Sequence, residues 1–204
     1  MVDMLCGVSY SFEEYIDLVK NCVEKGVTTG LDVSVQKIEA TKMNLQRMTR
    51  ISKQLVLNDD IIKLVQDLKY NVKWLVISEA WCGDGAQIIP VIAKVAGLSD
   101  KIELEIVLRD ENPDLIRKYH TNNSLAIPKL ICYDSNSGKE LGIWGPRPLR
   151  IAEKVKELKL SNPEMIHDDF VKEVQVIYNK DKGVSTIEDL MNCIKIWGTK
   201  EDFL

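Results

Sequence analysis

The sequence predicts an α/β fold with a mixed central sheet and helical extensions at both ends of the chain. First, apolar residues recur at helical spacing in the first and last thirds, whereas the middle holds short apolar or alternating runs typical of strands. Second, the elements of the middle follow the order β-α-β-α-β-β-α over residues 73–159. Third, this order joins a parallel crossover to a hairpin, which favours a mixed sheet with helices on both faces.

The first third is predicted to form three helices. Ser11 and Glu14 make a capping box before the first, and Gly26 is placed to end it. A second helix carries apolar residues at helical spacing between 38 and 55. A third begins at Asn58, because the two aspartates that follow it suit the first turn of a helix.

The middle third supplies the predicted sheet. Its strands are expected at 73–78, 102–109, 129–134 and 139–143. A helix follows the first strand and ends at Gly97, and Asn112-Pro113 begins the next. The turn Ser135-Asn136-Ser137-Gly138 joins the last two strands as a hairpin, and a helix with Ile151, Val155 and Leu158 closes this part.

The last third is predicted to be helical again. Asn162-Pro163 is expected to open one helix, and Ser185 with Glu188 is expected to cap another.

Size and charge limit the kinds of partner. With 204 residues, of which 45% are hydrophobic, the chain is long enough to bury a core without disulfides or metal. The 27 basic and 31 acidic residues give a net charge of −4, which argues against a nucleic-acid partner. No apolar run approaches the ~20 residues of a membrane span, and residues 1–10 lack the features of a signal peptide. We therefore expect a cytoplasmic protein with no membrane partner.

The most informative stretch is Trp81-Cys82-Gly83-Asp84-Gly85, where the first strand feeds a helix. Backbone N–H groups at a helix start favour thiolate, so Cys82 is a candidate nucleophile; the alternative is a small apolar side chain at a turn. Asp84 opposes ionisation, by about 0.7 kcal/mol at about 6 Å in bulk-like dielectric. We therefore expect Asp84 to make the Cys82 thiol less acidic than the helix start alone would make it. Asp84 has two possible roles. It either contacts a polar substrate group or relays a proton, or it is only a carboxylate at the start of the helix.

The Trp-Cys-Gly sequence, Pro90 in the following helix, the segment 110–113 and Ile127-Pro128 resemble thioredoxin in type and order. The resemblance covers residues 72–159. It implies a thioredoxin-like fold, with Cys82 as the nucleophile and Pro128 as the cis-proline. The longer strings WCGDGAQ, LRDEN, SLAIPKL and WGPRP resemble a bacterial thioredoxin-like subfamily whose active-site pair is reduced to one cysteine.

The resemblance divides the chain into three parts. These are an N-terminal helical extension at 1–71, a thioredoxin-like domain at 72–160 and a C-terminal helical extension at 161–204, expected to form one compact unit. The sequence leaves open whether the extensions cover sheet surface or form a homodimer interface.

The chain departs from thioredoxin at the second cysteine, which falls on Gly85. Cys82 therefore has no internal partner, and an external thiol must resolve any mixed disulfide. The other cysteines, Cys6, Cys22, Cys132 and Cys193, are interpreted as packing residues. Their spacing and that of the two histidines indicate neither a disulfide framework nor a metal site, and we expect no cofactor.

The loop Trp144-Gly145-Pro146-Arg147-Pro148 falls where thioredoxin has the third wall of its substrate groove. Mapped onto that position, Trp144 and Arg147 would face Cys82 together with Ile127 and Pro128. The flanking prolines stiffen the arginine backbone, which suits the binding of an anion. The alternatives are a core tryptophan and a surface arginine.

Two functions remain open. The first is monothiol thiol–disulfide exchange through Cys82, with a protein or low-molecular-weight thiol or disulfide as partner. The second is a redox-inactive binding protein that uses the Cys82/Pro128/Arg147 groove for a peptide or a small anionic ligand. The predicted substrate-binding residues are Trp81, Gly83, Asp84, Gly85, Ile127, Pro128, Trp144 and Arg147.

Overall fold

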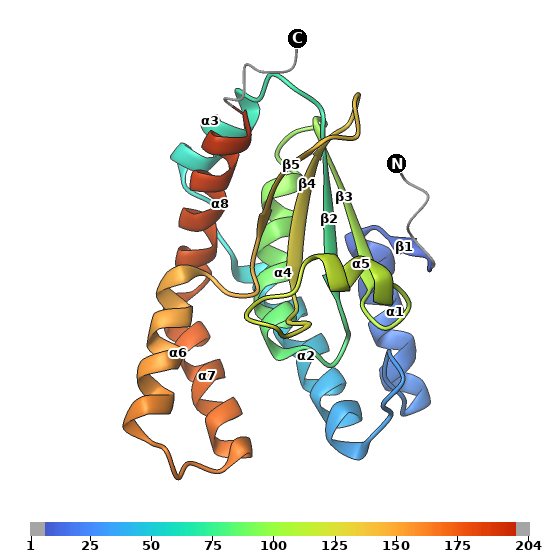
Figure 1. The fold of residues 1–204 in the computed structure, drawn as a ribbon, viewed down its shortest axis with the longest axis vertical. Coiled ribbons are helices and arrows are strands. Elements are labelled where there is room, and N and C mark those ends of the chain that lie inside the picture. The colour runs from blue at the N-terminus through green and yellow to red at the C-terminus, as the bar shows by residue number, and fades with distance from the viewer. Residues whose placement is uncertain (1–6, 199–204) are drawn as a thin grey trace.

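The computed structural model of the chain describes residues 7–198, which form a five-stranded mixed sheet in the order β1-β3-β2-β4-β5 (Figure 1). Strands β2 and β3 are parallel, whereas β4 is antiparallel to both β2 and β5. The predicted mixed α/β sheet is therefore confirmed. The strands are β1 (Ser9–Tyr10), β2 (Val72–Ser78), β3 (Ile102–Leu108), β4 (Lys129–Asp134) and β5 (Glu140–Trp144).

Helices cover both faces of the sheet, as predicted. In Figure 1, α5 lies in front of the strands and α4 behind them. The larger apolar core lies on the α4 side, and a smaller one that includes Leu115 and Ile116 of α5 lies on the other. The helices are α1 (Phe12–Lys25), α2 (Val35–Gln54), α3 (Asp59–Gln66), α4 (Gly83–Ala96), α5 (Pro113–Lys118), α6 (Leu149–Ser161), α7 (His167–Asp181) and α8 (Val184–Gly198).

The N-terminal helices begin and end where their capping residues predict. The backbone N–H of Ser11 donates to Glu14 at 2.7 Å, and that of Glu14 donates to the Ser11 hydroxyl at 3.2 Å. Gly26 ends α1 in the left-handed conformation with φ 65°, which glycine adopts without a steric cost. Asn58 caps α3 by accepting from Ile61 N–H at 3.0 Å. Strand β1, which pairs with β3, was not predicted because two residues are too few to show alternation.

Two predicted helix starts in the last third are wrong. Helix α7 begins at His167 and not at Asn162-Pro163, because the intervening residues make the turn that reverses the chain after α6. Helix α8 begins at Val184, so Ser185 lies inside it. The Ser185 backbone N–H donates to Asp181, one turn earlier, at 3.0 Å. The Asp181 carboxylate therefore caps the start of α8, in place of the predicted cap made by Ser185 and Glu188.

Helix α8 packs against the sheet through two tryptophans. The rings of Trp197 and Trp74 meet edge to face, with centroids 6.3 Å apart and an interplanar angle of 82°. Gly142 in β5 permits this approach, because a Cβ at that position would overlap the Trp197 indole, with Cε2 at 2.9 Å. Buried residues of all three predicted parts, such as Tyr15, Ile88 and Leu190, belong to the same core. Helix α1 of the N-terminal extension and helix α8 of the C-terminal extension therefore lie against the sheet.

We expect Gly142→Ala to destabilise the fold by about 1–3 kcal/mol, because the added methyl group must displace the Trp197 indole from the sheet. Urea unfolding measures this change. The matched control is Gly97→Ala, whose Cβ would lie 3.4 Å from the nearest backbone oxygen, an ordinary contact. Equal stability of the two variants would show that α8 does not depend on this close approach.

Candidate functional site

Cys82 occupies the junction between β2 and α4 and is the N-cap residue of α4. Its Sγ accepts a hydrogen bond from the Gly85 N–H at 3.3 Å and lies 3.5 Å from the carbonyl oxygen of Ile127, to which the thiol donates. The Ile127–Pro128 peptide bond is cis. The structure thus brings together the helix start and the proline-containing loop, which are far apart in the sequence.

The Cys82 sulfur is buried, whereas a reactive cysteine at a helix start is expected to be accessible to solvent. The residue is only 6% exposed and packs with Leu75, Ile77 and Ile127 in the smaller core. This burial, reinforced by the charge of Asp84, raises the pKa of the Cys82 thiol to about 12, against the opposing effects of two backbone N–H groups and Arg147. At pH 7 such a thiol is almost entirely protonated. The sequence predicted the direction from Asp84, but burial is the larger cause.

Arg147 reaches the start of α4 and binds Asp84 there. The guanidinium Nε donates to Asp84 Oδ1 at 3.0 Å, and Nη2 lies 2.8 Å from Oδ2. Two parallel contacts of this kind hold both planes in one orientation. The predicted arginine is therefore beside the motif, but its charge is already satisfied by Asp84 rather than being free for a ligand.

Trp144 does not face Cys82, and this part of the predicted groove is wrong. Its indole Nε1 donates to Asp189 of α8 at 3.0 Å. Trp144 is paired with Leu130, and paired residues share one face of a sheet. That face is the α4 side, whereas Cys82 packs in the core on the α5 side. Trp144 therefore positions α8.

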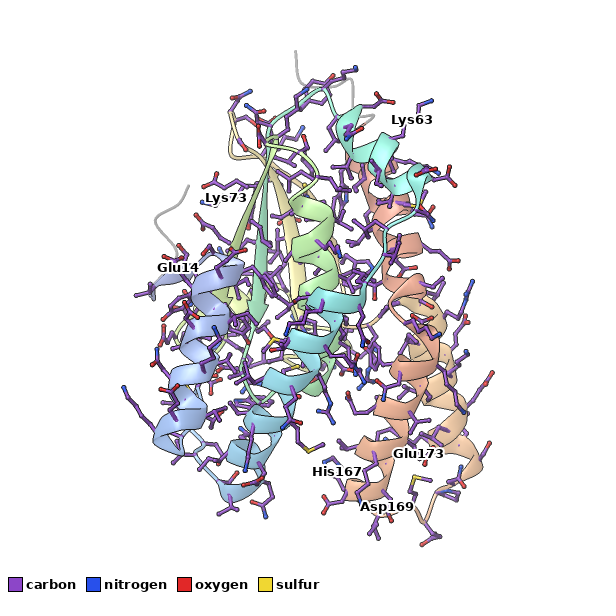
Figure 2. The ribbon with its side chains drawn as sticks, turned by 180° about the vertical axis from the view of Figure 1, so that it is seen from behind. Glu14, Lys63, Lys73, His167, Asp169 and Glu173 are labelled. Atoms are coloured by element: carbon purple, nitrogen blue, oxygen red, sulfur yellow. The ribbon has the colours of Figure 1, made fainter. Side chains whose placement is uncertain are left out.

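Helix α7 covers the start of α4. The labelled residues His167, Asp169 and Glu173 mark the beginning of α7 far from α4 in Figure 2, so α7 reaches α4 with its C-terminal half. There Gln175 accepts from the Gln87 amide at 2.8 Å and lies so close to Gly83 that a Cβ would be 3.0 Å from its Nε2.

Tyr178, one turn further along α7, is 4% exposed and lies beside Asp84. Burial and the Asp84 charge raise the pKa of Tyr178, and Cys82 is close enough to contribute to the same effect. Sequence reasoning missed both Gln175 and Tyr178, because nothing near the motif points to a helix about 90 residues later. The one local signal is Gln87, an amide on an otherwise apolar helix.

A further residue that sequence reasoning missed is Glu79, which is buried three positions before Cys82. The Asp110 N–H donates to its Oε1 at 2.8 Å, and the Thr29 hydroxyl donates to its Oε2. Burial raises the pKa of Glu79, whereas these hydrogen bonds oppose the rise. Glu79 fastens the loop before α2 to the ends of β2 and β3. An acidic residue directly after an apolar strand was the available signal.

Trp81 lies on the outer side of the same junction, between two cations. The Lys37 Nζ is 3.9 Å from the indole centroid, and the Arg109 guanidinium carbon is 4.8 Å from it. Both distances are within the range of cation–π attraction. Trp81 is thereby held against α2 and the end of β3.

The remaining cysteines act as packing residues where the structure describes them. Cys132 is 1% exposed, and burial raises its pKa to about 12. Cys22 is buried in α1, and Cys193 is partly buried against the core in α8. Cys6 lies outside the described residues.

Residues 7–198 contain neither a cluster suited to a metal ion nor a helix suited to crossing a bilayer. No group of three or more His, Cys, Asp or Glu side chains in this range is arranged to hold a metal ion. None of its helices combines the length and apolar character needed to cross a bilayer.

Comparison with known proteins gives one family match and two structural neighbours. A family model described as thioredoxin matches residues 30–159, beginning upstream of the predicted boundary at residue 72. A protein of unknown function from Pseudomonas aeruginosa has a TM-score of 0.60 and 19% identity, covering 91% of this chain and 98% of that one. An HIV epitope-scaffold has a TM-score of 0.56 and 18% identity with the same coverages. No curated protein matches the chain.

Replacing Asp84 by Asn is expected to lower the pKa of Cys82, because it removes the charge that adds to the effect of burial. At about 6 Å even a water-like dielectric predicts at least about a threefold gain in thiolate. The measurement is the pH dependence of Cys82 alkylation in protein whose other cysteines are replaced. Asp169→Asn, which changes a surface ion pair of α7, is the control. An unchanged or higher midpoint in Asp84→Asn would contradict this electrostatic account.

The geometry at Gly85 predicts how a second cysteine would be accommodated. A Cβ there would lie 3.4 Å from the Cys82 Cβ, close to the ~3.5–4.5 Å of disulfides, but only 2.5 Å from Ser78 Oγ. We expect Gly85→Cys alone to be destabilised, and Ser78→Ala/Gly85→Cys to form a disulfide between Cys82 and the introduced thiol on oxidation. Thiol titration and mass spectrometry detect the bond, with Ser78→Ala/Gly85→Ala as the control. Two free thiols in the folded, oxidised double variant would refute the prediction.

Proposed function

Because the chain belongs to the thioredoxin family, we propose that Cys82 carries out monothiol thiol–disulfide exchange and that α7 restrains the sulfur in the closed structure. We also propose that the chain is one of the bacterial single-cysteine proteins that its WCGDGAQ and WGPRP strings resemble, acting in a reducing cytoplasm. The observation that carries the proposal is the position of the sulfur, at the N-cap of α4 and beside Ile127.

The exchange consists of two balanced displacements. The Cys82 thiol first gives its proton to solvent, and the thiolate attacks one sulfur of a disulfide. A mixed disulfide with Cys82 forms, and the other sulfur leaves as a thiolate. An external thiolate then attacks the partner's sulfur in the mixed disulfide, which releases Cys82 and forms a new disulfide. This external thiol is needed because Gly85 occupies the position of the resolving cysteine.

The high pKa of Cys82 belongs to the closed arrangement. Burial is its largest cause, and we propose that displacement of Gln175 and Tyr178 from Gly83 and Asp84 opens the start of α4, lets water reach the sulfur and lowers this pKa. The backbone N–H groups of Gly85 and Asp84 and the charge of Arg147 would remain to favour thiolate. Displacement of α7 is therefore proposed to precede the attack.

The second candidate is a redox-inactive binding protein that uses the Cys82/Pro128/Arg147 groove for a peptide or small anionic ligand. It is favoured by the buried thiol and its pKa of about 12. In this case Cys82 serves only as the cap of α4, and a ligand must compete with Asp84 for Arg147.

The deciding experiment measures mixed-disulfide formation between glutathione disulfide and protein whose only cysteine is Cys82. We expect Gln175→Ala and Tyr178→Ala each to accelerate the reaction at least about fivefold, because access of water to the sulfur lowers the pKa of the thiol and raises the fraction of thiolate. A tenfold gain in thiolate corresponds to only about 1.4 kcal/mol. Glu173→Ala, on the exposed side of α7, is the matched control and should react as slowly as the parent.

Added reduced glutathione should then release free Cys82, which mass spectrometry detects. If Tyr178→Ala does not fold, Gln175→Ala alone decides the outcome, because its side chain can be truncated without emptying a large volume. Folded variants that react no faster than Glu173→Ala would reject the gated exchange and favour the redox-inactive protein.

A further inference from the structure

A cavity of about 320 Å³ lies between α2 and α7, beyond the Gln175 contact with α4. Its volume is near the lower end of ligand pockets and equals roughly ten water molecules, so it suits a small molecule. The floor includes the buried side chains of Gln87 and Tyr178, whereas its other polar residues are exposed. The polar lining consists of Arg50, Gln54, Gln87, Tyr178, Asn179 and Lys182.

The charge of this lining is entirely positive. Arg50 comes from α2 and Lys182 from the residue that ends α7, and no carboxylate of residues 7–198 lines the cavity. Within the part of the chain that the structure describes, neither cation lies in an ion pair.

Arg47, one turn before Arg50 on α2, increases the positive potential beside the cavity. Its guanidinium is partly buried and donates to the neutral Asn44 side chain at 2.7 Å, with no carboxylate partner among the described residues. Burial and, to a smaller extent, the charge of Arg50 lower the pKa of Arg47, so the two guanidinium groups repel each other. The site therefore has charge that a bound anion would compensate.

The two cations are held in place by the fold. Arg50 Nη2 donates to Asn179 Oδ1 at 2.6 Å, which links α2 to α7 at the edge of the cavity. Lys182 has φ 56°, a left-handed conformation that favours glycine. Gly183 follows it in close contact, since a Cβ there would lie 3.2 Å from both Leu55 and Val91. The end of α7 is thus fixed against α2 and α4, and Lys182 lines the cavity from this position.

We propose that this cavity binds a small molecule that carries a phosphate or carboxylate group, with Arg50 and Lys182 on opposite sides of the anion. An oxyanion accepts hydrogen bonds from both cations and from the neighbouring side-chain amides. The site is separate from the Cys82 sulfur, so the inference does not require Cys82 to react.

Calorimetric titration of the full chain with inorganic phosphate and, separately, with succinate tests the proposal and distinguishes the two anion chemistries. We expect saturable binding of at least one probe, weakened at least about tenfold by Arg50→Gln and by Lys182→Gly. The first variant can keep a hydrogen bond to Asn179, and the second favours the observed backbone conformation. Neither change is therefore expected to unfold the chain.

Lys53→Ala and Lys180→Ala are the matched controls, because both are exposed cations on the same two helices outside the cavity lining. They should alter the affinity by less than about twofold. No saturable binding of either probe, or equal weakening by cavity and control variants, would overturn the proposal. Cys82 reactivity is measured separately, so failure of the anion site leaves the exchange experiment unaffected.

Discussion

Burial of the first turn of α4 is the constraint on which the properties of this site depend. In an open thioredoxin-like arrangement, a cysteine at a helix start gains from the backbone N–H groups and keeps its sulfur in water. Here the same N–H contact is present at 3.3 Å, but the sulfur is enclosed, and desolvation outweighs the helix start. The pKa of Cys82 thus depends more on the burial of its sulfur than on its position at the helix start.

Three of the polar side chains enclosed at this site are bound by partners from other parts of the chain. Asp84 is bound by Arg147, Gln87 by Gln175, and Glu79 by the Thr29 hydroxyl and the Asp110 N–H. Each pair joins the β2–α4 junction to a different part of the chain. A buried polar group left alone would cost about 1–3 kcal/mol, so these contacts make the covered arrangement specific as well as stable. A movement of α7 would break the Gln87 contact and leave the other two pairs in place.

Helix α7 contributes residues to both proposed sites, and neither proposal requires the other. Its residues Gln175 and Tyr178 lie over the start of α4, and its last turn supplies one wall of the cationic cavity. Arg50 reaches α7 from α2 through Asn179. An anion at this place would bind both helices at once, and the helix that we propose to restrain Cys82 would then also be a ligand contact.

Local signals determined much of the fold from the sequence alone. These signals act over a few neighbouring residues, so they can be recognised in the sequence. They are the capping residues Ser11 and Asn58, the turn before β5 and the periodicity of β2 to α6. The position of Cys82 at the start of α4 is of the same kind. Only the tertiary structure decided that Trp144 turns to Asp189, that Arg147 binds Asp84 and that α7 lies against Gly83 at the start of α4. These contacts join residues 45 to about 90 positions apart, and burial, which sets the pKa of Cys82, is a property of all the neighbours together and of no single segment.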